Sequence, residues 1–160
     1  MGLPSILNGS IFIDNEDVSN FSYEKWTLIR REKISCVFQN LEIFNDLSID
    51  DNIELVTDLY TNIDRSKIDY LFSSLGLSGL KKNKAKTLSL GEKQKLAICR
   101  ALVRPFSLII LDEPFSHLDI KNIENICTVI NEITNNNNAN IILTSHSKAE
   151  MLKFHKEIFV

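Results

Sequence analysis

Four consecutive apolar residues, Leu108 to Leu111, run directly into two adjacent carboxylates, Asp112 and Glu113. A continuous apolar run of this length is typical of a strand that is buried on both faces of a parallel sheet. Ligands of α/β proteins bind at the carboxyl ends of such strands. We therefore predict an α/β fold in which Asp112 holds a hydrated Mg²⁺ and Glu113 polarises a water, as in a nucleotide hydrolase. The alternative is a strand that ends in a solvated turn.

Two further apolar runs end in polar side chains. The segment 34–39 ends in Gln39, and the segment 140–146 ends in His146. In a parallel sheet, the ends of these strands lie at the same edge as Asp112 and Glu113. Gln39 is either a metal ligand, through its carbonyl oxygen, or an ordinary loop residue, and a histidine such as His146 is more often a surface or core residue than a functional one.

A helix is expected just before the central apolar run. Ser89 suits the N-cap and Glu92 has the spacing of a capping box, so we predict a helix from about Glu92 to Val103. The Ser89 hydroxyl, the backbone N–H groups and the small Gly91 are the parts of an anion site. The alternative is an ordinary capped helix.

The chain after the carboxylates predicts a turn, a helix and a loop. The turn 114–119 ends in Asp119, and isoleucines then recur at helical spacing between Ile123 and Ile133. The run of asparagines 135–138 is expected to be a solvated loop.

Composition limits the function classes. The net charge is −3, which gives no electrostatic footprint for nucleic acid. The basic cluster 81–86 is expected to be a solvated loop, with a partner-binding role as the alternative. The three cysteines follow no metal-binding spacing, and their apolar surroundings predict buried, reduced thiols. No apolar run approaches the ~20 residues that a membrane span needs.

Between residues 47 and 87 the chain changes character. The segments 50–60 and 66–75 carry apolar residues at helical spacing, and Gly76 is expected to end the second helix. Just upstream, Glu42, Ile43 and Phe44 follow Gln39.

In order and spacing, these elements resemble the ATP-binding domain of ABC (ATP-binding cassette) transporters. The matching motifs are the Q-loop at 37–39, the signature motif at 88–92, Walker B at 108–113, the D-loop at 116–119, the switch histidine at His146, and an antiparallel strand at 9–14. The resemblance implies a P-loop NTPase (RecA-like) parallel sheet with an α-helical subdomain. It divides residues 1–160 into 9–46 (end of the antiparallel subdomain and Q-loop), 47–87 (helical subdomain) and 88–160 (signature motif to switch histidine).

The family's phosphate-binding P-loop, G-x-x-x-x-G-K-[ST], does not occur in this sequence. None of its five glycines is followed by lysine. We expect from this a truncated or mis-started reading frame, or half of a split domain, in which the P-loop strand and helix are missing. We also expect the strand 108–111 to have an unpaired, apolar flank. The signature motif departs from the family in having Leu90 where glycine is usual.

The resemblance implies ATP and Mg²⁺ as ligands and assigns a role to each candidate residue. Asp112 and Gln39 would bind Mg²⁺, Glu113 would polarise the attacking water, and His146 would contact the γ-phosphate. Ser89 and Gly91 would contact the ATP held by a second ABC ATPase domain in a head-to-tail dimer, with Asp119 at the dimer seam.

The resemblance also implies an integral membrane transporter subunit as partner, which would hold this chain at the cytoplasmic face of the cell membrane. A groove near the Q-loop would receive a helix of that partner, with Glu42, Ile43 and Phe44 as candidate contacts; Phe44 as plain core is the alternative. Two other functions stay open. One is a non-hydrolysing regulatory partner that donates its signature motif in trans. The other is a chromosome-maintenance ATPase, which the short insert between Q-loop and signature motif disfavours.

Overall fold

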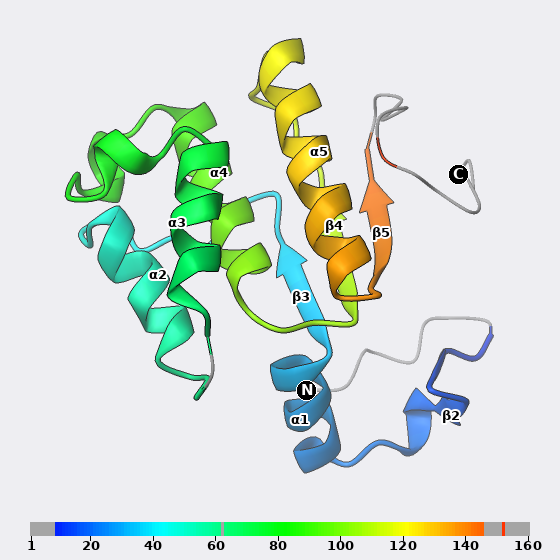
Figure 1. The fold of residues 1–160 in the computed structure, drawn as a ribbon. Helices are drawn as coiled ribbons and strands as arrows, with labels where there is room; N and C mark the ends of the chain where they lie inside the picture. The colour runs from blue at the N-terminus through cyan, green and yellow to red at the C-terminus, as the bar shows by residue number, and fades with distance from the viewer. Residues whose placement is uncertain (1–8, 62, 146–151, 153–160) are drawn as a thin grey trace.

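Three parallel strands form the centre of the molecule (Figure 1). In the computed structural model, which describes residues 9–61, 63–145 and 152, they lie in the order β3 (Ile34–Val37), β4 (Leu108–Asp112) and β5 (Asn140–Thr144). The register places Val37 opposite Leu111 and Asp112 opposite Thr144. Because all three strands run in the same direction, their carboxyl ends meet at one edge of the sheet.

β4 is the central strand of this sheet. The expectation that the strand 108–111 has an unpaired flank is therefore wrong, because β4 pairs with β3 on one side and with β5 on the other. Among the described residues, the open edges of the sheet belong to β3 and β5. The reason is the crossover through helix α5 (Ile120–Asn136), which returns the chain to lie directly beside β4.

The two faces of the sheet differ in burial. On one face, Ile109 and Leu111 are fully buried against the core, whereas Leu108 and Ile110 on the other face are only half-buried. The expectation that this strand is buried on both faces is thus wrong within the described part of the chain. Helices cover the face with Ile109 and Leu111, and their buried side chains, such as Leu102 of α4, form a single cluster with those of the strand.

Helix α4 (Leu90–Val103) begins and ends at local signals in the sequence. The predicted capping box is present, because the Ser89 hydroxyl accepts from the backbone of Glu92 while the Glu92 carboxylate accepts from the backbone of Ser89. The helix ends before Pro105, as predicted, and starts two residues earlier than expected.

Helix α5 runs further than the sequence suggested. Asn135 and Asn136 are helical rather than part of a loop, and the N–H of Asn137 donates to the carbonyl of Ile133. Six buried residues on one stripe of this helix hold its last turn on the core: Ile126, Cys127, Val129, Ile130, Ile133 and Thr134. Tertiary packing thus overrides the preference of asparagine for loops.

Helices α2 (Ile49–Thr57) and α3 (Arg65–Ser74) pack against α4, on the side away from β5 (Figure 1). Both were predicted from their apolar spacing. Ser48 and Asp51 form a second capping box at the start of α2. After α3, Gly76 adopts a φ of +70°, a conformation that glycine takes without steric cost, and so ends the helix as expected.

The N-terminal described segment forms a small hairpin followed by a helix. β1 (Phe12–Ile13) pairs antiparallel with β2 (Glu16–Asp17), in agreement with the antiparallel strand expected at 9–14. Helix α1 (Tyr23–Glu32) then leads into β3. Three short 3-10 helices complete the described elements: Val18–Asn20, Ser78–Leu80 and Ala85–Thr87.

All three cysteines are free thiols. Cys99 and Cys127 are fully buried, as predicted, and Cys36 is half-buried. Burial raises the pKa of the Cys99 thiol to about 12. In the described part of the chain, none of the helices has the length and apolar character that crossing a membrane requires.

Candidate functional site

The carboxyl ends of the three strands bring most of the predicted polar residues to one edge. Asp112 is the last residue of β4, Thr144 is the last residue of β5, and Gln39 follows β3 by two positions. The Thr144 hydroxyl donates to Asp112 Oδ1 over 2.6 Å, which fixes the orientation of that carboxylate. His146, the predicted γ-phosphate contact, lies outside the described residues.

The backbone of Glu113 is held on both sides. Its N–H donates to the carbonyl of Thr144 over 3.0 Å, and its own carbonyl accepts from the Gln94 side chain over 3.1 Å. Its φ is +46°, in the left-handed region that non-glycine residues seldom adopt. Such a conformation persists only where the surrounding contacts enforce it. The strand thus ends in a sharp, strained turn that carries the Glu113 carboxylate.

A second strained turn follows β3. Leu41 and Glu42 have φ values of +61° and +43°, and the Leu41 N–H donates to the carbonyl of Phe38 over 2.9 Å. The Arg100 guanidinium, which reaches over from α4, donates to the carbonyl of Glu42 over 2.6 Å. The sequence did not predict this turn, because neither Leu nor Glu signals a left-handed conformation.

The start of α4 lies against the turn that follows Glu113. A Cβ added to Gly91 would lie 3.2 Å from the carbonyl oxygen of His117 and 3.4 Å from a Leu118 methyl carbon. The small residue predicted here for approach to an anion is thus needed for the approach of α4 to residues 117–118 of the same chain. Ser89 is exposed, and Leu90 beside it is 48% exposed.

Gln94 connects the same two elements, and sequence reasoning missed it. It is a side-chain amide that is only 1% exposed, on the apolar face of α4. Its Nε2 donates to the carbonyl of Glu113, and its Oε1 accepts from the N–H of His117 over 3.3 Å. The available signal was a polar residue at a position where the helical pattern of Ile98, Ala101 and Leu102 requires an apolar one.

Asp119 acts locally as a helix cap. Its carboxylate accepts from the N–H of Asn122 over 2.8 Å and from the Asn122 side chain over 2.9 Å. The backbone hydrogen bond from Asn122 lowers the pKa of Asp119 below its ordinary value. The side chain is exposed at the start of α5.

The donor set at this edge fits a hydrated Mg²⁺. Asp112 offers a carboxylate whose orientation is fixed by Thr144, and Gln39 is exposed two positions after β3, the strand that pairs with β4. Among the described residues, no three His, Cys, Asp or Glu side chains gather into a group that could hold a metal. A metal here would therefore take most of its ligands from water and phosphate, which is how Mg²⁺ usually binds beside nucleotides.

A groove of about 410 Å³ lies beside the turn 38–42. It lies between that turn, the C-terminal half of α2 and the last turns of α4; the lining residues include Phe38, Phe44, Leu55, Leu59, Tyr60, Arg100 and Arg104. Phe44 is 51% exposed, so the alternative that it is plain core is wrong. Its ring lies 5.3 Å from the Arg100 guanidinium. The groove therefore combines exposed apolar side chains with two cations.

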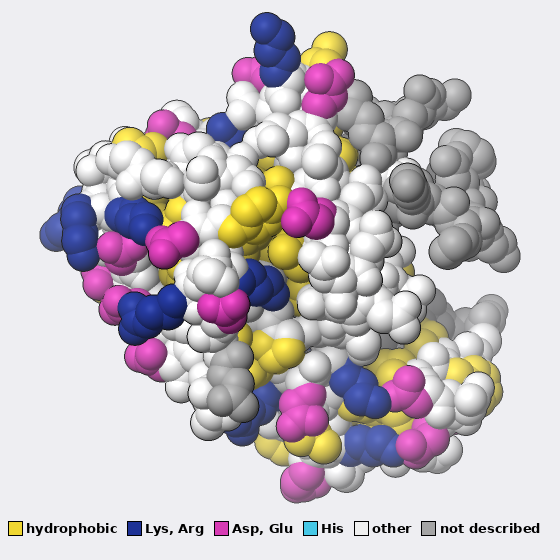
Figure 2. All heavy atoms as spheres, in the orientation of Figure 1, with side chains coloured by type: hydrophobic (Ala, Val, Ile, Leu, Met, Phe, Trp, Pro, Cys, Tyr) yellow, Lys and Arg dark blue, Asp and Glu magenta, His cyan; other side chains and the backbone are white. Residues whose placement is uncertain are grey.

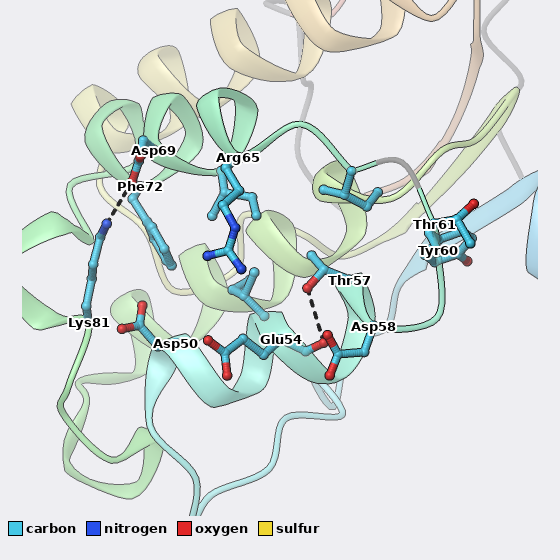
Figure 3. Close-up of a pocket in the computed structure, with 13 residues that line it drawn as sticks. Asp50, Glu54, Thr57, Asp58, Tyr60, Thr61, Arg65, Asp69, Phe72 and Lys81 are labelled. Carbon is cyan, nitrogen blue, oxygen red and sulfur yellow. Dashed lines mark hydrogen bonds and ion pairs between the residues drawn. The ribbon is translucent and has the colours of Figure 1, made fainter.

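A second cavity, of about 720 Å³, lies between α2 and α3 (Figure 3). Arg65 points into it (Figure 3), and its lining also includes Glu54, Ile53 and Phe72. At its rim Lys81 pairs with Asp69 over 2.8 Å. Figure 2 shows basic and acidic side chains side by side over this part of the surface. The cavity lies in a different part of the molecule from the edge with Asp112 and Glu113.

Comparison with known proteins assigns the chain to one family. The sequence model of the ABC transporter family matches residues 1–116. The chain is 31% identical to a phosphonates import ATP-binding protein of Fusobacterium nucleatum, over 98% of this chain and 68% of that protein. It is 29% identical to a macrolide export ATP-binding/permease protein of Escherichia coli, over 92% of this chain and 24% of that protein. The chain therefore belongs to the ABC transporter family, as the sequence motifs predicted.

A solved structure agrees with this assignment. A dimeric ATP-binding cassette in a post-hydrolysis state, bound to ADP and Pi, superposes with a TM-score of 0.75 at 27% identity, over 87% of this chain and 63% of that chain. The predicted fold class, the P-loop NTPase fold of ABC ATPases, is confirmed. The chain thus spans about two thirds of the length of these two relatives (63% and 68%).

Proposed function

We propose that this chain forms the hydrolytic edge of an ABC transporter ATPase subunit, which couples ATP hydrolysis at a head-to-tail dimer interface to transport by a membrane partner. One observation carries the proposal. Asp112 and Glu113 lie at the carboxyl end of β4, Thr144 lies at the carboxyl end of the neighbouring parallel strand β5, and Gln39 comes two residues after β3. This is the place where α/β sheets bind nucleotides.

Each residue then has a role that matches its chemistry. Asp112, oriented by Thr144, would hold Mg²⁺ through water, and Gln39 would supply a carbonyl oxygen. Glu113 accepts a proton from, and so polarises, the attacking water. His146 contacts the γ-phosphate. Mg²⁺ neutralises charge on the phosphates when bound; the protein contributes positioning and charge stabilisation.

The signature residues face a second subunit. Ser89 is exposed at the N-terminus of α4, where backbone N–H groups attract anions. We propose that Ser89 and Gly91 contact the nucleotide of the partner subunit and that Asp119 lies at the interface between the two subunits. Support comes from the dimeric state and the bound ADP and Pi of the similar cassette.

The groove beside Phe44 is our proposed docking site for the membrane partner. The relatives in transport systems are importers and exporters, one of them fused to a permease. The proposal includes the division into 9–46, 47–87 and 88–160, with the groove where all three parts meet. It implies a location at the cytoplasmic face of the membrane, reached through the partner.

Hydrolysis needs a phosphate-binding loop, which this sequence does not contain. We therefore propose that the 160-residue chain alone does not hydrolyse ATP. The second candidate function is a non-hydrolysing partner that donates Ser89 and Gly91 to the ATP of another subunit, and the exposure of Ser89 at the start of α4 favours it. A pull-down in which the chain never associates with an intact ABC subunit excludes that candidate.

The test of the main proposal is ATP hydrolysis by the native assembly, purified from its own cells with and without Glu113→Gln. We expect this change to lower kcat by about 10²–10⁴-fold, because it removes the base at the attacking water. The matched control is Glu124→Gln, which neutralises an exposed carboxylate on α5. Hydrolysis at the wild-type rate in Glu113→Gln overturns the role of Glu113.

A further inference from the structure

Gln94 forms a buried link between the helix with the signature residues and the turn with the catalytic carboxylate. A buried side-chain amide must have partners for both of its polar atoms. Here the partners are two backbone groups of one turn, the carbonyl of Glu113 at 3.1 Å and the N–H of His117 at 3.3 Å. Only one orientation of the amide satisfies both, since the carbonyl needs a donor and the N–H needs an acceptor.

This link fixes the direction of the Glu113 side chain. The N–H of Glu113 is bonded to Thr144 on β5, and its carbonyl is bonded to Gln94 on α4. With both neighbouring peptide groups held, the bond from Cα to Cβ has a single direction. The φ of +46° at Glu113 is a conformation that non-glycine residues seldom adopt, so the surrounding contacts must hold the residue in it.

A second contact joins the same two elements. The Cα of Gly91 faces the carbonyl of His117 and the side chain of Leu118, and no room remains there for a methyl group without a shift. The first two turns of α4 and the turn 113–118 therefore share one tightly packed seam. A displacement of the helix end that carries Ser89 must move the turn with it.

We propose that Gln94 is a positioning residue that makes the orientation of the Glu113 carboxylate depend on the position of the helix carrying Ser89 and Gly91. The inference rests on the proposed function, in which Ser89 and Gly91 meet the partner's nucleotide while Glu113 acts on the subunit's own. Occupancy of one nucleotide site is thereby transmitted, through the rigid seam of a single subunit, to the catalytic group of the other.

The test uses Gln94→Glu in the native assembly, with its ATPase kinetics measured against wild type between pH 6 and 8. An ionised carboxylate still accepts from His117 but cannot donate to the Glu113 carbonyl. We expect kcat to fall by about 10-fold or more at pH 8, because small displacements of a reacting group are costly. KM for ATP should change by less than about 2-fold, since Gln94 does not touch the nucleotide.

Protonation should rescue this variant. Burial raises the pKa of a carboxyl group, so a glutamic acid at position 94 regains a donor as the pH falls. We expect the kcat of Gln94→Glu to return to within about 3-fold of wild type near pH 6, whereas Gln94→Leu, which has neither donor nor acceptor, keeps a constant deficit.

The matched control is Asn52→Asp, the same chemical change in another fully buried amide. Asn52 binds the backbone of Phe44 and Ser48 and lies in α2, away from the seam. A general loss of stability affects both variants. A ratio of variant to wild-type kcat that changes with pH in Gln94→Glu but not in Asn52→Asp therefore supports the positioning role of Gln94. The same change with pH in both variants overturns that role.

A readout without catalysis separates this inference from the proposed function. In Gln94→Leu, the His117 amide should exchange its hydrogen about 10-fold faster, while the Glu113 amide, bonded to Thr144, should exchange as in wild type. Unchanged exchange at His117, or a wild-type kcat in Gln94→Glu at pH 8 when Glu113→Gln is inactive, overturns the role of Gln94. Full activity of Glu113→Gln overturns the proposed function instead, and His117 exchange still tests the seam.

Discussion

Two turns leave the same edge of the sheet, and α4 holds both of them. The turn 38–42 follows β3 and is held by Arg100 at the carbonyl of Glu42; the turn 113–118 follows β4 and is held by Gln94 at the carbonyl of Glu113. In each, a non-glycine residue takes a left-handed conformation at the point where α4 reaches the backbone. One helix therefore supports the geometry of the whole edge.

The two supports differ in kind. Gln94 is neutral, 1% exposed and bonded to two backbone groups of its turn. Arg100 is charged and only half-buried, and burial lowers its pKa below the ordinary value. Its guanidinium also lies over the exposed ring of Phe44. The turn 113–118 is thus fixed from within the core, whereas the turn 38–42 is held at the surface beside the proposed docking groove, where a partner can reach it.

The largest expected effect on stability comes from the buried support. Gln94→Leu leaves two partly buried backbone groups without partners, each of which costs about 1–3 kcal/mol. We expect the free energy of unfolding of the full chain to fall by roughly 3 kcal/mol, measured by urea denaturation with Trp26 fluorescence. A loss below about 1 kcal/mol would mean that water enters the seam and replaces the amide.

Arg100→Leu should cost less, about 1 kcal/mol, because solvent can reach the carbonyl of Glu42 when the guanidinium is removed. Arg100→Lys, which keeps the charge and a donor, is the control, and its free energy of unfolding should lie between those of wild type and Arg100→Leu. The same urea series provides the measurement. A cost equal to that of Gln94→Leu contradicts the contrast between a buried and a surface support.

The smallest effect concerns the far end of the turn 113–118, where Asp119 caps α5. The pKa of Asp119 is lowered in the folded state, so its carboxylate stabilises the fold above its unfolded pKa and loses this contribution as the pH falls through the folded value. Asp119→Asn keeps a capping side chain without a charge. We expect this variant to lose less stability than wild type between pH 5 and pH 2, measured as urea midpoints.

Glu124→Gln, at an exposed position in the second turn of α5, is the comparison for that experiment, since Glu124 has no role as a cap. An acid sensitivity of Asp119→Asn equal to that of wild type contradicts a lowered pKa of Asp119 in the folded state.

Much of the edge was predictable from local patterns. The apolar run 108–111 followed by Asp112, and the spacing of Ser89 and Glu92, predicted the central strand and the helix start. The register of the sheet then confirmed that Asp112 lies at the same edge as the end of β3. The roles of Gln39, Ser89, Gly91, Asp112, Glu113, Asp119 and His146 stay predictions.

The sequence alone determined the central strand β4, the helices α2, α3 and α4 and the capping box of α4, because short-range hydrogen bonds and apolar periodicity depend on neighbouring residues. The order and spacing of its motifs determined the family. Only the tertiary structure decided that β4 is central, that Leu41, Glu42 and Glu113 adopt left-handed conformations, and that Gln94 and Gly91 join α4 to the turn 113–118. These features depend on contacts between segments far apart in the chain. Such contacts leave no local pattern, since a buried glutamine and a strained glutamate look in sequence like any polar residues.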